Sequence, residues 1–161
     1  MASRAASVRE QLQQYNSPVQ FGSARVIELS NWDWQRDYGS APLPRRSVNG
    51  DDLLEINFAG NAVSRASWRT AVLLKEGHYQ FHGLVRLEPL TGRLAARGEP
   101  AICLRTSEDS TSLSVTNAMG WIALTNNFVV TSPKYVDLIC EFAGGRGRAQ
   151  FDLTTLKLRQ Q

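Results

Sequence analysis

Short apolar stretches alternate with polar residues from Pro18 onward, and clusters of Gly, Pro, Asn and Ser separate one stretch from the next. This pattern is typical of β-strands joined by turns. The clearest alternation spans residues 78–87, and a two-residue period of this kind predicts a sheet with one buried side. The face predicted to be buried carries Tyr79, Phe81, Gly83, Val85 and Leu87.

The same pattern predicts about nine strands and an all-β fold, an antiparallel β-sandwich over residues 17–161. The strands are expected at 19–29, 53–58, 68–74, 78–87, 101–106, 111–116, 121–130, 135–142 and 149–158. The pair Asn126 and Asn127 indicates a bulge or bend, and residues 38–52 form the longest predicted loop. Residues 1–16 contain good helix formers but few apolar positions, so they are predicted to form a tail or a short helix.

Length and composition fit one globular domain. The chain has 161 residues, of which 42% are hydrophobic and 20% charged. The net charge is +3 and the arginines are scattered, whereas nucleic-acid binders concentrate their charge in one stripe. A nucleic-acid partner is therefore disfavoured. No apolar run approaches the ~18 residues that a membrane helix needs, so no membrane partner is expected.

The two cysteines, Cys103 and Cys140, do not form a CxxC pair, so the sequence has no zinc or redox motif of that type. They fall on opposite phases of their predicted strands, with Cys140 toward the core, which argues against a disulfide between them. Residues 1–14 lack the apolar centre of a secretory signal. These observations leave the cellular compartment open.

The sequence carries no Ser–His–Asp order, GxSxG elbow, HExxH motif or complete phosphate-binding loop. The two histidines, His78 and His82, share a strand face but lie about 13 Å apart, which is too far for one metal site. The chain is therefore predicted not to be an enzyme. A β-sandwich hydrolase stays open as a rival, and it would need two carboxylates about 5 to 9 Å apart in a cleft.

Three segments in the second half resemble motifs of jelly-roll carbohydrate-binding modules, a group within the galactose-binding-like domains. Residues 74–86 (LKEGHYQFHGLVR) resemble the family's pGxYxfsgxvR strand, and residues 120–130 (GWIALTNNFVV) resemble its gxWxxlsxxFxv strand. Residues 151–156 (FDLTTL) resemble the closing fDxvxL strand. Order and spacing agree over roughly residues 70–158. The resemblance implies a jelly-roll fold and a non-catalytic accessory module that binds carbohydrate.

The resemblance also implies roles for two single residues. It places Trp121 in the core, and it implies that Asp152 helps to hold a structural calcium ion. Calcium takes about six to eight oxygen ligands. The family's acidic residue after the opening Phe is missing here, because Phe21 is followed by Gly22 and Ser23.

Aromatic side chains are the expected sugar contacts, because sugar rings stack their apolar faces on Trp or Tyr while their hydroxyls bond to polar side chains. Trp32 and Trp34 are spaced by two and interleaved with polar residues, so they form an aromatic platform if this segment is extended; burial of both rings in the core is the alternative. The polar side chains are expected to line a groove beside the rings. The complete set of binding candidates is Trp32, Trp34, His82, Arg86, Arg105 and Tyr135.

The leading hypothesis is thus a non-catalytic module that recognises carbohydrate by aromatic stacking. Carbohydrate binding would make an extracellular or periplasmic location the expected one. The alternative is a structural or protein-interaction β-sandwich that docks against other domains of a parent protein. An exposed apolar patch would favour that alternative.

Overall fold

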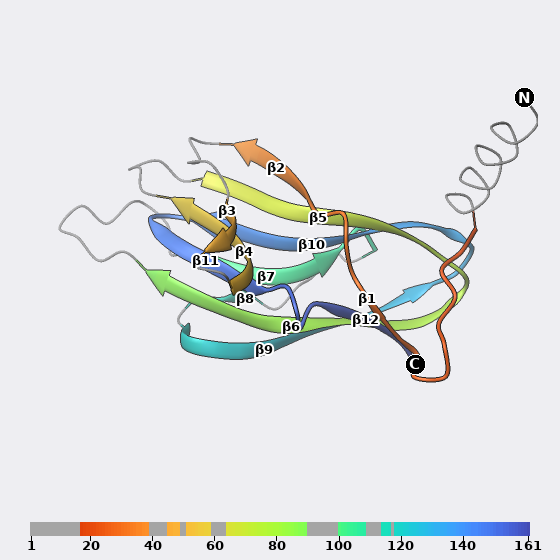
Figure 1. Cartoon of the computed structure of the whole chain (residues 1–161). Helices are drawn as coiled ribbons and strands as arrows, with labels where there is room; N and C mark the ends of the chain where they lie inside the picture. The colour runs from red at the N-terminus through yellow and green to blue at the C-terminus, as the bar shows by residue number, and fades with distance from the viewer. Residues whose placement is uncertain are drawn as a thin grey trace, which may run out of the picture.

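The computed structural model describes residues 17–38, 45–48, 51–58, 64–89, 100–108, 114–116 and 118–161 (Figure 1). The tail or helix predicted at 1–16 lies outside these residues. The described chain forms two antiparallel sheets that pack face to face as a β-sandwich. This part of the protein contains no helix long and apolar enough to cross a membrane.

The larger sheet, sheet A, is built around one long central strand, β6 (Gly77–Pro89). Strand β9 (Ala118–Val130) pairs along one edge of β6, and β12 (Lys157–Gln160) and β11 (Gly147–Asp152) pair one after the other along its second edge. The sheet continues outward through β1 (Val26–Glu28), β4 (Asp51–Phe58) and β3 (Arg45–Val48).

The smaller sheet, sheet B, has five strands. Their spatial order is β2 (Asp33–Tyr38), β5 (Ser64–Leu74), β10 (Lys134–Gly144), β7 (Ala101–Thr106) and β8 (Ser114–Val115). The central pair, β5 and β10, stays in one register from Ser64 to Leu74. Such long uninterrupted pairing leaves each side chain on a defined face, inward or outward.

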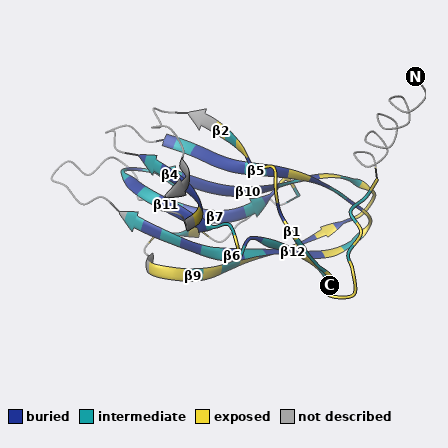
Figure 2. Ribbon diagram, viewed as in Figure 1, coloured by how far each residue is buried: buried dark blue, intermediate teal, exposed yellow. Residues whose placement is uncertain are grey.

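The core lies between the sheets and is filled by the inward faces that alternation predicts. Tyr79, Phe81, Val85 and Leu87 on β6 are at most 1% exposed, which confirms the predicted buried face. Figure 2 shows the same alternation of buried and partly exposed positions along β6. Each fully buried large apolar side chain contributes about 1.5–3 kcal/mol, so this layer supplies most of the stabilisation.

Polar bonds also cross between the layers. The indole N–H of Trp68 on β5 donates to the carbonyl oxygen of Glu55 on β4 at 3.1 Å. The amide of Asn126 on β9 donates to the carbonyl oxygen of Leu104 on β7 at 3.1 Å. Because buried polar groups without partners are costly, these bonds fix the sheets in one relative position.

The predicted strands at 53–58, 68–74, 78–87, 101–106, 121–130 and 135–142 are confirmed. In the predicted strand 19–29, only Val26–Glu28 pairs with a neighbour. The predicted strand 149–158 is two strands, β11 and β12, separated by a turn at 153–155. In 111–116, Ser114–Val115 forms a strand and residues 111–113 lie outside the described residues.

Two predicted irregularities are misplaced. The expected long loop at 38–52 contains strand β3, and β4 already begins at Asp51. The bend expected at Asn126 and Asn127 is absent, because both residues keep their register with β6. The register of this pair shifts instead between Val85 and Leu87, opposite the start of β9.

Cys103 and Cys140 are both buried, and neither forms a disulfide. Cys140 belongs to the core between the sheets, whereas Cys103 lies on the outward face of sheet B beside Glu141. The opposite phases predicted from the sequence are therefore confirmed.

Candidate functional site

The site begins with a gap in the pairing of β6. Pairing with β12 ends at His82, and pairing with β11 begins at Val85. The turn at 153–155 fills this gap, and the hydroxyl of Thr155 accepts the backbone N–H of Leu84 at 2.8 Å. The same hydroxyl donates to the carbonyl oxygen of Asp152 at 2.8 Å. The turn thus replaces the missing strand contact with a side-chain hydrogen bond.

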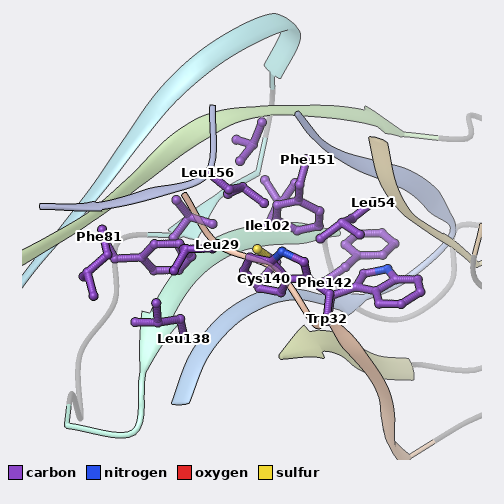
Figure 3. Packing of buried hydrophobic residues seen from close by; sticks show 14 of the residues in the cluster. Leu29, Trp32, Leu54, Phe81, Ile102, Leu138, Cys140, Phe142, Phe151 and Leu156 are labelled. Atoms are coloured by element: carbon purple, nitrogen blue, oxygen red, sulfur yellow. The ribbon is translucent and has the colours of Figure 1, made fainter. Parts of the chain in front are cut away.

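Glycine at position 83 lets this turn approach β6. A Cβ atom on Gly83 would stand 2.6 Å from Cδ2 of Leu156, which is closer than real Cβ atoms approach a neighbour. Leu156 is 1% exposed and packs in the core, as the close-up in Figure 3 shows. A glycine in a strand often marks such a close approach of another backbone.

A groove runs along the outward face of sheet A beside this turn. Strands β6 and β9 form its floor, and the turn and β12 form one wall. Its volume is about 370 Å³. We call it the β6–β9 groove. Its polar lining residues are Gln80, His82, Thr125, Thr154, Thr155, Lys157 and Arg159.

Trp121 does not line this groove itself, but it precedes the lining residue Ala123 by two positions on the same face of β9. Its side chain is 39% exposed, so the expectation that Trp121 belongs to the core is wrong. Ile122 and Leu124 pack against the core, and alternation therefore turns Trp121 outward. Figure 2 shows β9 as the most exposed long strand of the sheet in that view.

An irregularity in the sheet sets the position of Trp121. Val85 pairs with Ile122 and Leu87 pairs with Ala118, so residues 119–121 face the single residue Arg86. The guanidinium carbon of Arg86 lies 5.0 Å from the centre of the Trp121 ring. Bulges of this kind redirect side chains and often occur beside functional sites. The contact is a cation–π interaction on an otherwise exposed ring.

Arg86 is itself held by polar neighbours across the sheet. Its Nε donates to Oε1 of Gln150 at 2.9 Å, and Nε2 of Gln150 donates to Oε2 of Glu55 at 2.9 Å. Glu88 forms an ion pair with Arg86 at 3.4 Å. Because Gln150 and Glu55 are buried, this chain of bonds keeps the guanidinium against the Trp121 ring.

His82 lies in the middle of the groove and is only partly exposed. Burial lowers the pKa of His82 below its ordinary value of 6.5, and the positive charges of Arg159 and Lys157 lower it further. The imidazole is therefore neutral at pH 7, with one nitrogen that donates and one that accepts.

The aromatic platform expected at Trp32 and Trp34 is not on the surface. Trp32 is 5% exposed and stacks on Phe81 with ring centres 6.4 Å apart. Trp34 packs edge-on against Trp68 at 5.6 Å and against the core. The two rings share a face, as their spacing predicts, but it is the inward one (Figure 3 shows Trp32).

Arg105 lies on the outward face of sheet B and does not join His82 and Arg86, which the sequence placed in the same groove. Its Nε and Nη2 donate to Oε2 of Glu141 at 2.9 and 2.6 Å. Arg65 donates to the other oxygen of Glu141 at 2.8 Å. Burial raises the pKa of Glu141, but the bonds from both arginines outweigh burial and leave it below its ordinary value. Arg105 therefore has a structural partner.

Tyr135 is the second residue of β10 and is 54% exposed. It borders a second depression of about 420 Å³ that includes Asn31, Asp33 and Thr70. The lining of this depression shares no residue with that of the β6–β9 groove. Tyr135 and His82 thus belong to different surfaces, and the expected single site divides into two.

Asp152 caps the turn after β11. Its Oδ1 accepts the backbone N–H of Thr154 at 3.0 Å and the hydroxyl of the same residue at 2.6 Å. Among the residues described, no three His, Cys, Asp or Glu side chains gather closely enough to hold a metal ion. The described donors around Asp152 are fewer than the six to eight oxygens that calcium takes. A calcium ion at Asp152 therefore depends on the family resemblance alone and stays a prediction.

Solved structures with the same architecture exist at low sequence identity. A family 4 carbohydrate-binding module aligns with a TM-score of 0.53 and 14% identity, over 81% of this chain and 86% of that one. The fold is that of a jelly-roll carbohydrate-binding module. The active domain of tailspike protein 4 from bacteriophage CBA120 aligns with a TM-score of 0.51 and 12% identity, over 91% of this chain and 22% of that one.

A family 61 carbohydrate-binding module in complex with β-1,4-galactotriose aligns with a TM-score of 0.47 and 14% identity, over 83% of this chain and 91% of that one. No protein-family model and no curated protein sequence matches the chain. The comparisons thus establish the jelly-roll fold, and the choice of site depends on the residues of this chain.

Proposed function

We propose that this domain is a non-catalytic module that binds a sugar chain in the β6–β9 groove. The observation that carries the proposal is Trp121, a partly exposed indole held by Arg86 on the same face of β9 as a groove with hydrogen-bonding walls. Ligand sites combine an apolar or aromatic surface with a few polar groups that fix orientation. A jelly-roll fold shared with carbohydrate-binding modules supports the same conclusion.

Each part of the groove has a role in this mechanism. The apolar face of one sugar ring packs on the exposed part of the Trp121 indole. Arg86 presses on the same indole and holds it in place, so that little side-chain entropy is lost on binding. Gln80, His82 and Thr125 supply donors and acceptors for sugar hydroxyls along the floor.

The chemistry of the groove supports binding without catalysis. Hydrolysis of a glycosidic bond needs two carboxylic groups flanking that bond. The described residues that line the groove contain no Asp or Glu. Glu55 and Glu88 are engaged by Gln150, Arg86 and Arg148 beside the groove.

The test is a glycan array followed by calorimetry on wild-type protein, Trp121→Ala and Tyr135→Ala. Tyr135→Ala is the matched control, because it removes an exposed ring from the other surface. We expect Trp121→Ala to weaken binding by about 10- to 200-fold, since a stacked ring contributes roughly 1.5–3 kcal/mol. Tyr135→Ala should bind like wild type.

Loss of binding in Tyr135→Ala with full binding in Trp121→Ala would transfer the function to the second depression. Absence of binding to every glycan would overturn the proposal altogether.

A further inference from the structure

The charged side chains described in the lining of the β6–β9 groove are all of positive sign. Lys157 and Arg159 stand two residues apart on β12, so their side chains emerge on one face about 7 Å apart. Both side chains line the groove. Within the described part of the chain, neither forms an ion pair with a carboxylate.

Several other cations of the described residues form ion pairs. Arg86 and Arg148 pair with Glu88, and Lys134 pairs with Glu108. Glu28 lies opposite Lys157 in the β1–β12 pairing, but it is exposed and outside the groove lining. Among the described residues, the lining of the groove therefore holds two cations and no carboxylate.

An uncompensated pair of cations beside an aromatic ring selects for a ligand that carries negative charge. Carboxylates accept charge-assisted hydrogen bonds from Lys and Arg, and these bonds are about twice as strong as neutral ones. Resting on the proposed function, we propose that the groove recognises acidic sugar chains, with a uronate carboxylate bound between Lys157 and Arg159 and a more distant sugar ring of the same chain on Trp121.

The pKa of His82 agrees with this charge distribution. Arg159 and Lys157 both lower it, which places their positive charge within reach of the groove floor. Because His82 is then neutral at pH 7, it acts on hydroxyls and leaves the carboxylate to the two cations. The Trp121 ring, the polar side chains of the groove floor and the two cations of β12 are thus three separate contacts for one sugar chain.

The decisive experiment compares oligosaccharides that differ only in charge. Oligogalacturonate and its carboxyl methyl ester share one backbone, as do glucuronate-containing oligosaccharides and their esters. Calorimetry on wild-type protein should show binding of a uronate form at least about tenfold tighter than its ester. Raised salt should weaken this preference, because exposed charges are screened.

Variants assign the preference to the two cations. Lys157→Gln and Arg159→Gln should each weaken binding of the uronate form by about 3- to 10-fold and weaken binding of the ester by less. Lys75→Gln is the matched control, since it removes the same charge from an exposed position in the β5–β6 turn. It should alter neither affinity.

The outcomes separate this inference from the function on which it rests. Equal binding of acid and ester, abolished in both cases by Trp121→Ala, would overturn the inference and keep the sugar-binding function. Binding of neither form, nor of any glycan, would overturn both. Binding of chondroitin sulfate but not of unsulfated chondroitin, which has the same uronate carboxylates, would reject the uronate in favour of a sulfate.

Discussion

Gly83→Ala tests whether the groove wall is built as described. The new Cβ would stand 2.6 Å from Cδ2, 3.3 Å from Cγ and 3.4 Å from Cα of Leu156. Leu156 is buried in the core and its own backbone is among the three atoms contacted, so the side chain cannot simply rotate away. Overpacking of this kind costs about 1–3 kcal/mol.

The expected loss in thermal stability follows from chain size. For a domain of 150–250 residues, 1 kcal/mol corresponds to roughly 2–4 °C in Tm. Gly83→Ala should therefore lower Tm by about 2–12 °C in a thermal melt followed by circular dichroism. The matched control is Gly120→Ala in β9, where an added Cβ meets nothing within 4 Å. It should leave Tm unchanged or raise it, because glycine weakens a strand by about 0.5–1 kcal/mol.

A double variant assigns the cost to the named contact. Leu156→Ala alone should destabilise the fold by about 2–5 kcal/mol, as deletion of a buried leucine does. In the Gly83→Ala background the same change should cost less, because it also relieves the clash. Equal Tm values for Gly83→Ala and Gly120→Ala, or strict additivity in the double variant, would refute this account of the turn.

Three further predictions concern charge and chemistry elsewhere in the sandwich. Glu141→Gln should lower the unfolding free energy at pH 7 by about 1.5–3 kcal/mol, the worth of hydrogen bonds to a charged group. The pKa of Glu141 is below its ordinary value of 4.5 in the folded state, so this stability is present above pH 4.5 and is lost as pH falls through the folded-state pKa. Urea melts from pH 7 to pH 3 should show the gap to wild type closing, and a constant gap would argue against the ion pairs. Lys157→Gln should raise the pKa of His82 in an NMR titration, since Lys157 lowers this pKa in the wild type. An unchanged pKa would show that the charge of Lys157 does not act on His82 in the groove. Cys103 and Cys140 should react with a thiol reagent only after denaturation, and rapid reaction in the native protein would contradict their burial.

Alternation of apolar and polar side chains was enough to predict the sandwich. It works because burial repeats every two residues in a strand with one buried face, as it does in β6. Alternation predicts the strands at the edges of a sheet less well. Strand β1 forms three residues of pairing where eleven were expected, because residues 19–25 contain turn-forming positions such as Arg25, with a φ of 53°.

The candidate site was predicted only in part. His82 and Arg86 were placed on the correct outward face of β6, since alternation decides that face directly. Arg105 and Tyr135 were grouped with them, although they lie on sheet B. Alternation states which side chains face outward, but it does not state which sheet a strand joins, because that depends on pairing over long sequence distances.

The exposure of Trp121 was not predicted, because its match to a family motif placed it in the core although alternation along its own strand places it outward. In β9 the core positions are Ile122, Leu124, Phe128 and Val130, so position 121 falls on the outward phase. That signal was present in the sequence. Trp32 and Trp34 show the converse: polar neighbours suggested exposure, yet the space between the sheets required large rings there.

The most direct test of the central claim is an NMR titration that follows the indole N–H resonances of the four tryptophans as the best-binding glycan is added. The account predicts a saturable shift of the Trp121 resonance, together with backbone shifts at His82, Thr125 and Lys157 in the groove. Trp32, Trp34 and Trp68 should stay in place. An unmoved Trp121 resonance with shifts gathered around Tyr135 would contradict it.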